Sequence, residues 1–269
     1  MRTRIIYNEK LSAIDLAQDI NTEYLEVLGC YAPNLKFKPV SMYKVNLEYA
    51  TDIFLDMGYG NLNKLNLNNL SGINIIISHN HIDHNLGLLE LLIYLKIHKV
   101  KLDNRINVYM PFKSNGLNIC KLLKKQKTLF KIYEINENKE IEIGGRIISF
   151  CKTEHKGESY AIKLFNKKDR SFFVYTSDLA KVTISLIRFC KKADTIIIDG
   201  GRPLKNKFSL GNYHGHTEKI LKDIICAKPA KIIITHMKEY ADENLFKSVY
   251  PEKNKIPIEI AKLSKKYKL

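Results

Sequence analysis

Short apolar runs typical of β-strands recur along the whole chain, and segments with helical periodicity separate only some of them. The strand-like runs are 24–29, 43–48, 52–55, 73–78, 106–110, 141–150, 160–164, 172–176, 195–198 and 231–235. The helix-like segments are 86–98, 115–126, 179–191, 217–227 and 257–267. The first half is mostly strand after strand, whereas the second half alternates and contains two βα units that end in the runs TIIID and KIIITH. This order predicts an α/β (α+β) fold, a four-layer αββα sandwich of two packed sheets with helices outside.

The chain has 269 residues, enough for one domain with a sizeable core, and no linker rich in Pro, Gly or Ser divides it. We therefore expect a single domain over residues 23–269. Residues 1–22 precede the first strand as an N-terminal extension, in which 11–20 fit an accessory helix. Residues 256–269 are rich in lysine and are expected to form a basic amphipathic helix that covers a sheet.

Several cellular settings are disfavoured by the composition. No stretch of eighteen apolar residues is present, so we expect no membrane-spanning helix and no membrane partner. The N-terminus has Arg2 and Arg4 but no apolar region followed by a small-residue cleavage site, which argues against a secretory signal. The five cysteines are odd in number and scattered, with no CxxC motif. A reduced, cytoplasmic location fits this pattern best.

The charge balance is strongly basic, with 44 Lys and Arg against 28 Asp and Glu, a formal net charge of +16. One interpretation is a polyanionic partner such as nucleic acid. The other is a compositional bias toward Lys, Asn and Ile, and it is favoured because only seven of the basic residues are arginine, the residue that best forks onto phosphates. Charge alone therefore permits a nucleic-acid partner without requiring one.

The segment SHNHIDH follows directly on the strand-like run INIII and places four possible metal ligands within six residues: His79, His81, Asp83 and His84. Side chains two apart on an extended backbone point the same way, so His79 and His81 can bind one ion together. Asp83 and His84 lie on the turn into the next helix and can serve a second ion nearby. Imidazole with carboxylate suits Zn, Mn or Fe(II). The spacing favours a metal site over a solvated histidine-rich turn.

Polar residues also stand at the ends of four other apolar strands, where α/β proteins place ligand groups: Asp56, His155, Asp178 and His236. A single histidine in such a place is more often a hydrogen-bonded structural residue. Asp199 follows a strand in the same way, and an aspartate there can simply be a turn or cap residue. Position at a strand end does not by itself separate Asp178 from Asp199.

Taken together, HxHxDH with a downstream His, an Asp and a final His resembles the signature of the metallo-β-lactamase superfamily, from about Tyr24 to His236. The resemblance implies the metallo-β-lactamase fold and two divalent metal ions, with Zn favoured and Mn or Fe as alternatives. The implied ligands of the first ion are His79, His81 and His155. Those of the second are Asp83, His84 and His236, and Asp178 is implied to bridge both ions. The resemblance assigns Asp56 a supporting role, in which it orients a ligand or the turn.

Within this superfamily, the continuation Asp83-His-Asn-Leu-Gly-Leu resembles the DHxxGL motif of ribonuclease Z and related phosphodiesterases. That branch carries a histidine 22 residues before the final ligand, where it stabilises phosphoryl oxygens or protonates the leaving group. His214 has this spacing to His236, and His216, 20 residues before His236, is the alternative. Only 23 positions separate His155 from Asp178, which leaves no room for the tRNA-gripping arm that ribonuclease Z inserts there.

The sequence therefore predicts a dinuclear metal-dependent hydrolase, most specifically a nuclease-like phosphodiesterase whose metal-activated water attacks a small phosphodiester. Its substrate is expected to be a cyclic nucleotide or the end of a short nucleic acid, and a homodimer is compatible with the sequence. One alternative is an acyl hydrolase that acts on a lactone, thioester or β-lactam. Another is a non-hydrolytic metal-binding partner protein, which the complete ligand set disfavours.

Overall fold

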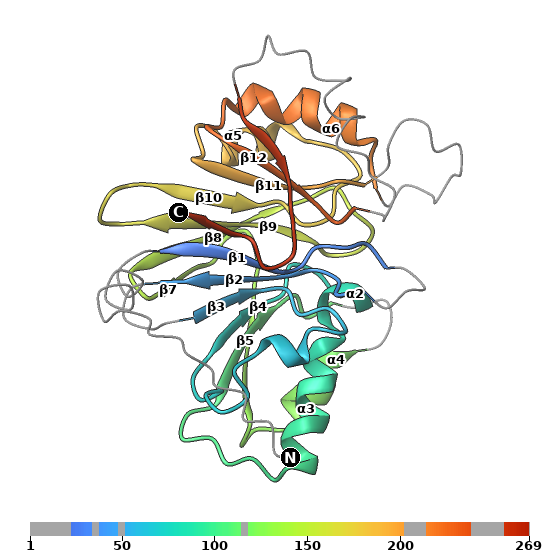
Figure 1. Cartoon of the computed structure of the whole chain (residues 1–269), viewed down its shortest axis with the longest axis vertical. Coiled ribbons are helices and arrows are strands. Elements are labelled where there is room, and N and C mark those ends of the chain that lie inside the picture. Colours follow the sequence, from blue (N-terminus) through green and yellow to red (C-terminus); the bar gives the residue numbers. More distant parts are fainter. Residues whose placement is uncertain are drawn as a thin grey trace, which may run out of the picture.

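The computed structural model describes residues 23–33, 38–47, 52–113, 118–201, 214–237 and 256–268. Its strands form two stacked sheets, and helices cover their outer faces, with α5 and α6 on one side and α2, α3 and α4 on the other (Figure 1). The predicted N-terminal extension, including its expected helix at 11–20, lies outside the described residues. In the described ranges, no helix has the length and apolar character that crossing a membrane requires.

The described residues give each sheet seven strands. The first runs in the order β14 (Lys266–Lys268), β1 (Tyr24–Gly29), β2 (Met42–Asn46), β3 (Asp52–Leu55), β4 (Asn74–Ile76), β5 (Ile106–Met110) and β6 (Phe130–Glu134). The second runs in the order β13 (Ile258–Ile260), β12 (Ile232–Thr235), β11 (Thr195–Asp199), β10 (Phe172–Tyr175), β9 (Tyr160–Asn166), β8 (Arg146–Lys152) and β7 (Glu140–Ile143). Strands β3 to β6 are parallel to one another, as are β10 to β13.

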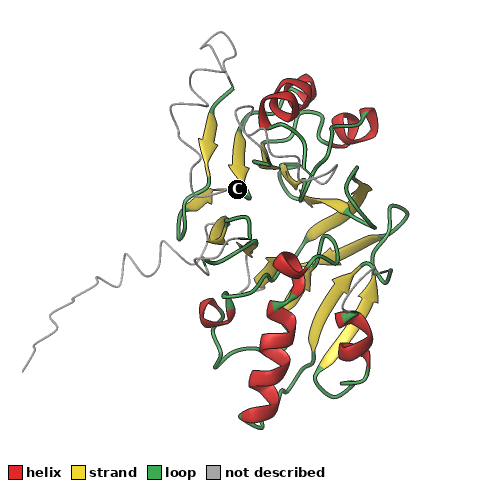
Figure 2. Cartoon of the chain, turned by 90° about the vertical axis from the view of Figure 1, so that its right-hand side faces the viewer, coloured by secondary structure: helices red, strands yellow, loops and turns green. Residues whose placement is uncertain are grey.

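The helices are α2 (Ile82–Asn85), α3 (Gly87–Ile97), α4 (Ile119–Lys124), α5 (Ile184–Phe189) and α6 (Thr217–Ile224), with short 3-10 turns η3 (Leu62–Lys64) and η5 (Ile225–Ala227). Figure 2 shows α3 as the longest of them, lying along its sheet. The boundaries follow local signals: Asn118 and Thr183 cap α4 and α5 by accepting backbone N–H groups through their side chains. Four of the five predicted helical segments therefore contain a helix, and α4 and α5 begin at these caps, four and five residues later than the sequence predicts.

Three apolar clusters confirm the predicted four layers. Inward-facing residues such as Tyr43, Ile162 and Phe173 pack between the two sheets. A second cluster joins the first sheet to α3 and α4, and a third joins the second sheet to α5 and α6. Successive side chains of a strand belong alternately to the cluster between the sheets and to an outer cluster, because they point to opposite faces of the sheet. Burial of apolar surface on both faces of both sheets is the main stabilising contribution to such an architecture.

The expected helix at 257–267 is wrong. This segment forms β13, which pairs in parallel with β12, and β14, which pairs antiparallel with β1. It therefore adds one edge strand to each sheet. The run Ile-Glu-Ile and the alternation Lys-Tyr-Lys fit a period of two, and the open edges supply hydrogen bonds that an isolated basic helix lacks.

Two further strand predictions differ from the structure. The run 141–150 is a hairpin of β7 and β8 and not a single strand, because Gly144 and Gly145 adopt positive φ angles of 55° and 76° and reverse the chain. Strand β6 was not predicted, since only one of its five residues, Phe130, is fully buried and its apolar signal is weak. It lies at the edge of the first sheet and pairs with β5.

Candidate metal centre

The candidate site forms where parallel strands of both sheets end, and three residues there have left-handed backbones. Asp56 after β3, Ser177 after β10 and His236 after β12 have φ angles of 56°, 57° and 54°. This conformation is costly for residues with a Cβ, although Asp and His tolerate it better than most. Each turns the chain sharply at the strand end, so that polar side chains of separate strands converge. Such local strain is typical of functional sites.

The segment HNHIDH leaves β4 in an extended conformation and then enters α2. His79 pairs with Ser159 in an isolated β-bridge, and His81 is the extended N-cap residue of α2. Their rings lie close together, with His79 Nε2 and His81 Nδ1 3.0 Å apart. The first turn of α2 then places Asp83 and His84 in the buried interior. The local geometry is the one that the spacing predicts.

One group of possible ligands joins the first two histidines to His155, from the loop after β8. His155 Nε2 lies 3.0 Å from His81 Nδ1. Asp178 Oδ2 completes this group at 3.7 Å from the Nε2 atoms of both His79 and His155. One potential ligand atom from each of the four residues lies within 4.8 Å of the others.

A second group shares Asp178 and consists otherwise of Asp83, His84 and His236. Asp83 Oδ2 lies 3.0 Å from His236 Nε2 and 3.4 Å from His84 Nε2. Asp178 Oδ1 lies 3.3 Å from His84 Nε2 and 3.6 Å from His236 Nδ1. The two oxygens of Asp178 thus face different groups. The structure brings together all seven of the predicted ligands.

The donor atoms fit divalent cations. His84 Nε2 and Asp178 Oδ1 are fully buried, yet neither has a hydrogen-bond partner. Buried polar atoms are rarely left without a partner, since the lost hydration is not recovered. Both atoms point into the second group, where a cation would satisfy them. Imidazole nitrogens and carboxylate oxygens are the ligands that zinc and similar metals take in proteins.

Buried hydrogen bonds orient the histidines from behind. Asp56 Oδ2 lies 2.7 Å from His84 Nδ1, which leaves Nε2 of that ring directed into the site. Tyr175, on the other sheet, donates its hydroxyl to the same carboxylate oxygen at 2.6 Å. The hydroxyls of Ser78 and Ser177 lie 3.0 Å and 3.2 Å from His79 Nδ1. Asp56 therefore lies where the resemblance implies, and the serines and Tyr175 are supporting residues that the sequence did not reveal.

His214 and His216, the two candidates for the proton donor, occupy different environments. His214 Nδ1 lies 2.7 Å from Asp199 Oδ2, and its Nε2 faces Asp178 Oδ2 at 3.8 Å. Its ring stacks on that of His236 with centroids 5.1 Å apart. His216 is the exposed N-cap residue of α6 and belongs to none of the ligand groups found among the described residues. The geometry therefore favours His214 as the residue beside the metal groups.

Asp199 is a member of the site that sequence reasoning left open. Besides His214, it accepts the backbone N–H groups of Leu179 at 2.9 Å and Gly201 at 2.7 Å. These contacts fix its carboxylate and, through it, the His214 ring. Its position at the end of β11 was the available signal, because Asp178 follows the same end of the neighbouring parallel strand, β10.

Two glycines permit the close approaches that shape the site. A Cβ on Gly58 would lie 2.0 Å from the carbonyl oxygen of Asp83, so only glycine allows the turn after β3 to contact α2. A Cβ on Gly215 would lie 2.4 Å from the carbonyl oxygen of Ala180. That second contact brings the residue next to His214 against the loop that follows Asp178.

The site is a dense electrostatic cluster. Burial opposes ionisation of Asp178, but His236 and His84 outweigh it and hold the pKa of that carboxyl well below its usual range. Burial likewise opposes protonation of His236, yet Asp178 and the other carboxylates raise its pKa to about 10. The pKa of His84 is raised well above its usual value for the same reason. His81 differs, since burial and the neighbouring His155 lower its pKa to about 4. The carboxylates thus attract positive charge chiefly toward the second group.

Metal binding at the second group is expected to release protons. Near neutral pH, His84 and His236 are protonated in the metal-free protein because their pKa values are raised. A metal ion needs the neutral imidazole and must displace those protons, so its apparent affinity should rise with pH up to about pH 10 and fall in acid. Calorimetric titration with Zn²⁺ in buffers of different ionisation enthalpy would measure the release. The control variant His98→Ala, which changes an exposed histidine outside the site, should release the same number of protons as the wild type. A binding heat that does not depend on the buffer would contradict this prediction.

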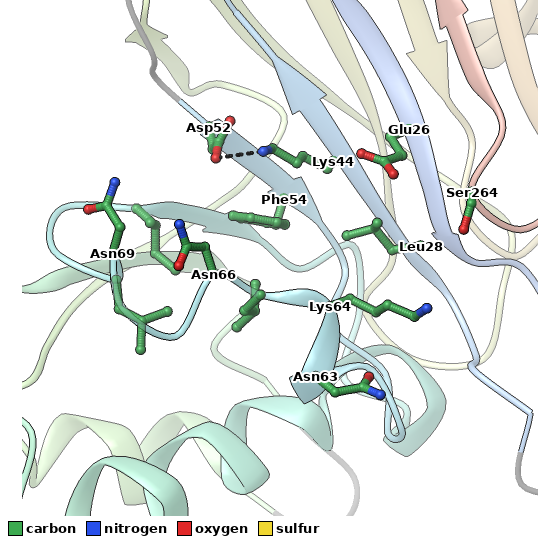
Figure 3. Close-up of a pocket in the computed structure, with 13 residues that line it drawn as sticks. Glu26, Leu28, Lys44, Asp52, Phe54, Asn63, Lys64, Asn66, Asn69 and Ser264 are labelled. Atoms are coloured by element: carbon green, nitrogen blue, oxygen red, sulfur yellow. Dashed lines mark ion pairs between the residues drawn. The ribbon is translucent and has the colours of Figure 1, made fainter. Parts of the chain in front are cut away.

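A cavity of about 310 Å³ lies elsewhere, on the outer face of the first sheet (Figure 3). Leu28 and Phe54 form apolar parts of its lining, and Lys44 forms an ion pair with Asp52 at 2.9 Å beside them. It contains none of the predicted site residues, so the His/Asp cluster and not this cavity is the candidate functional site.

Comparison with known proteins agrees with this geometry. The family described as "Beta-lactamase superfamily domain" matches residues 52–237, which run from β3 to just beyond β12 and include every residue of the ligand groups. Among curated proteins, none matches the chain.

Solved structures share the fold at low sequence identity. The metallo-β-lactamase fold protein YhfI from Bacillus subtilis has a TM-score of 0.72 at 21% identity, over 93% of this chain and 100% of that one. A diphosphatase from the PhnP family has a TM-score of 0.69 at 14% identity, over 92% of this chain and 98% of that one. The short form of human tRNase Z (ELAC1) has a TM-score of 0.67 at 15% identity, over 91% and 98%. These similarities confirm the metallo-β-lactamase fold.

Proposed function

This chain belongs to the β-lactamase superfamily, whose members are mostly metal-dependent hydrolases, and from that premise we propose that it is a phosphodiesterase. The proposed substrate is a small phosphodiester, either a cyclic nucleotide or the end of a short nucleic acid. The observation that carries the proposal is the histidine held by Asp199 beside the shared Asp178.

We assign the two ligand groups to two divalent ions. His79, His81 and His155 would hold one ion, and Asp83, His84 and His236 the other, with Asp178 shared between them. Two ions in such a site supply a water of lowered pKa and neutralise charge on the attacking and leaving oxygens. Asp56 and the serines orient the ligand histidines, and no protein nucleophile is needed.

His214 is proposed as the residue that meets the phosphoryl group. Burial opposes its protonation, but the Asp199 carboxylate outweighs this and raises the pKa of His214. A protonated imidazole at this place can stabilise the charge on phosphoryl oxygens and give its proton to the departing alkoxide from Nε2. Asp199, at Nδ1, keeps that proton-bearing nitrogen directed toward the site. An ester or lactam places less negative charge there, so the pair suits a phosphodiester better than an acyl substrate.

Two further observations support a small phosphoryl substrate. The chain between His155 and Asp178 consists of the β9–β10 hairpin, and no arm extends from it. Two of the solved structures with this fold are described as a diphosphatase and a tRNase, and both names refer to phosphoryl substrates. Because the hairpin carries no arm that could hold a large substrate such as a tRNA, it favours a small phosphodiester.

Hydrolysis of bis(p-nitrophenyl) phosphate by protein loaded with Zn²⁺ or Mn²⁺ tests this proposal. We expect turnover that follows metal content and disappears in His79→Ala, because that residue contacts both His81 and Asp178 in the first group. Protein that binds metal but leaves this substrate intact, while hydrolysing thioesters or lactones, would overturn the phosphodiesterase assignment.

A further inference from the structure

The basic charge of the chain is concentrated in one part of it. Residues 93–131 contain ten of the 44 basic residues but only one of the 28 acidic ones, Asp103, and so carry +9 of the net +16. A compositional bias toward lysine would spread charge evenly and would not exclude acids from one segment. The lysine-rich composition therefore does not explain this asymmetry.

All ten of these basic residues are exposed, and we call nine of them, all except Lys113 at the far end of β5, the basic edge. They are Lys96, Lys99, Lys101, Arg105, Lys121, Lys124, Lys125, Lys127 and Lys131. They come from the ends of α3 and α4, from the segments that lead into β5 and β6 and, in the case of Lys131, from the start of β6. Strands β5 and β6 are parallel, so both segments reach the same edge of the sheet. The Arg105 guanidinium donates to the Lys127 carbonyl oxygen at 3.3 Å and joins them.

Several lysines elsewhere in the described residues have acidic partners. Lys44, Lys167 and Lys231 form ion pairs with Asp52, Glu142 and Glu259. Within the described ranges, no ion pair joins a residue of the basic edge to a carboxylate. Uncompensated like charges repel one another, and an anionic partner would relieve this repulsion.

We infer that the basic edge binds the phosphate backbone of a nucleic acid whose end lies in the metal site. This inference rests on the proposed function and selects, between its two candidate substrates, an oligonucleotide over a cyclic nucleotide. Lysines contact phosphates without reading sequence, so the contact adds affinity and not base specificity.

The distance between the two sites sets the length of strand that could reach both. The metal groups lie beyond the carboxyl ends of β3 and β4, and the basic edge lies at the amino ends of β5 and β6. Five residues of β5 at about 3.3 Å each separate these edges by roughly 17 Å. In Figure 1, α2 lies near the middle of the molecule, and α3 runs from it toward the lower end. At about 3.4 Å per stacked nucleotide, a strand of roughly five or six nucleotides would span this distance.

A nucleic acid fits better than the other anionic partners. A strand is continuous and can touch the basic edge and the metal site together. An anionic membrane in contact with the basic edge would leave the metal site about 17 Å from the bilayer surface. An acidic protein could contact the basic edge through carboxylates, but it contains no phosphodiester for the metal groups.

The test compares oligonucleotides of different length. Binding of fluorescent 4-nucleotide and 20-nucleotide RNAs would be measured by anisotropy with metal-loaded His214→Ala protein, in which cleavage is slow. One variant combines Lys99→Gln, Lys101→Gln, Lys125→Gln and Lys127→Gln. Its matched control makes the same charge change on the α5–α6 side, with Lys191, Lys192, Lys219 and Lys222 each replaced by Gln.

We expect the basic-edge variant to bind the 20-nucleotide RNA at least about tenfold more weakly at moderate salt. The slope of log K against log salt should become less negative by about 3, because four phosphate contacts are lost and each contributes about −0.7 for a single strand. Binding of the 4-nucleotide RNA, and hydrolysis of bis(p-nitrophenyl) phosphate in the wild-type background, should be unchanged. The control should match the parent protein throughout.

Equal binding of the long RNA by both lysine variants would overturn the inference, as would equal losses for short and long RNA. The inference would also be overturned if the wild-type protein bound no RNA but sedimented with phosphatidylglycerol vesicles. These results are separable from failure of the proposed function, which appears as loss of phosphodiester hydrolysis whatever the state of the lysines.

Discussion

Replacement of Asp178 by asparagine is expected to abolish hydrolysis and to reduce the content of both metal ions together. Its two carboxylate oxygens face different ligand groups, so a single change of charge affects both. Changes to residues that merely support a metal ligand cost about 10- to 100-fold in affinity or activity. We expect loss of a shared ligand to exceed about a thousandfold. Elemental analysis and the rate with bis(p-nitrophenyl) phosphate measure the two effects.

The control for this variant is Asp223→Asn, which removes a carboxylate from α6, outside the ligand groups. It should keep both ions and full activity. Asparagine has nearly the same shape as aspartate, so circular dichroism of Asp178→Asn should show an intact fold. If Asp178→Asn retained two ions per chain, the shared role of this carboxylate would be wrong.

Replacement of His214 by alanine is expected to leave the metal content unchanged but to slow turnover by about 10²- to 10⁴-fold, the usual contribution of a general acid. The effect should be largest for substrates with poor leaving groups, because these depend most on proton donation. In the wild type, the rate should fall as the pH rises through the raised pKa of His214, since the donor then loses its proton. The variant should lack this alkaline decline. Rates measured across pH for two leaving groups check the prediction.

The matched change is His216→Ala, which removes the neighbouring but exposed histidine. It should behave like the wild type in rate and pH dependence. If His216→Ala is slow and His214→Ala is fully active, the assignment of the proton donor must be exchanged. If His214→Ala loses metal, that residue is a ligand, since potential ligand atoms, one each from His214, Asp178, Asp199 and His236, also lie within 4.8 Å of one another.

Much of the fold could be predicted because its signals are local. β1, β3 and β5 occupy the predicted residues, and α3 differs from its predicted range by one residue at each end. Apolar runs reveal buried strands without knowledge of their partners. Prediction from apolar runs failed for the C-terminal segment, because residues 257–267 are basic and only weakly periodic. Its conformation follows from the two open sheet edges, which the sequence does not display.

Part of the candidate site could likewise be predicted from local sequence, and part could not. His79, His81, Asp83 and His84 lie within six residues of one strand end, so short-range geometry brings them together and local sequence was sufficient to find them. Asp199 could not be distinguished from a turn residue, and Tyr175 was not detected, because the importance of each depends on a distant partner. Tyr175 meets Asp56, 119 residues away, only where the two sheets pack face to face.

The proposed general acid shows most clearly what the sequence alone cannot predict. Spacing to His236 made both His214 and His216 candidates, since both lie just ahead of a helix in a polar stretch. The packing of β11 beside β10 and β12 places Asp199 against His214 and leaves His216 at the exposed start of α6. Chain sequence reports which groups are present and how they are spaced along one strand or helix. Which of them share a charge or a proton depends on distances between strands, and these distances exist only after the sheets have packed.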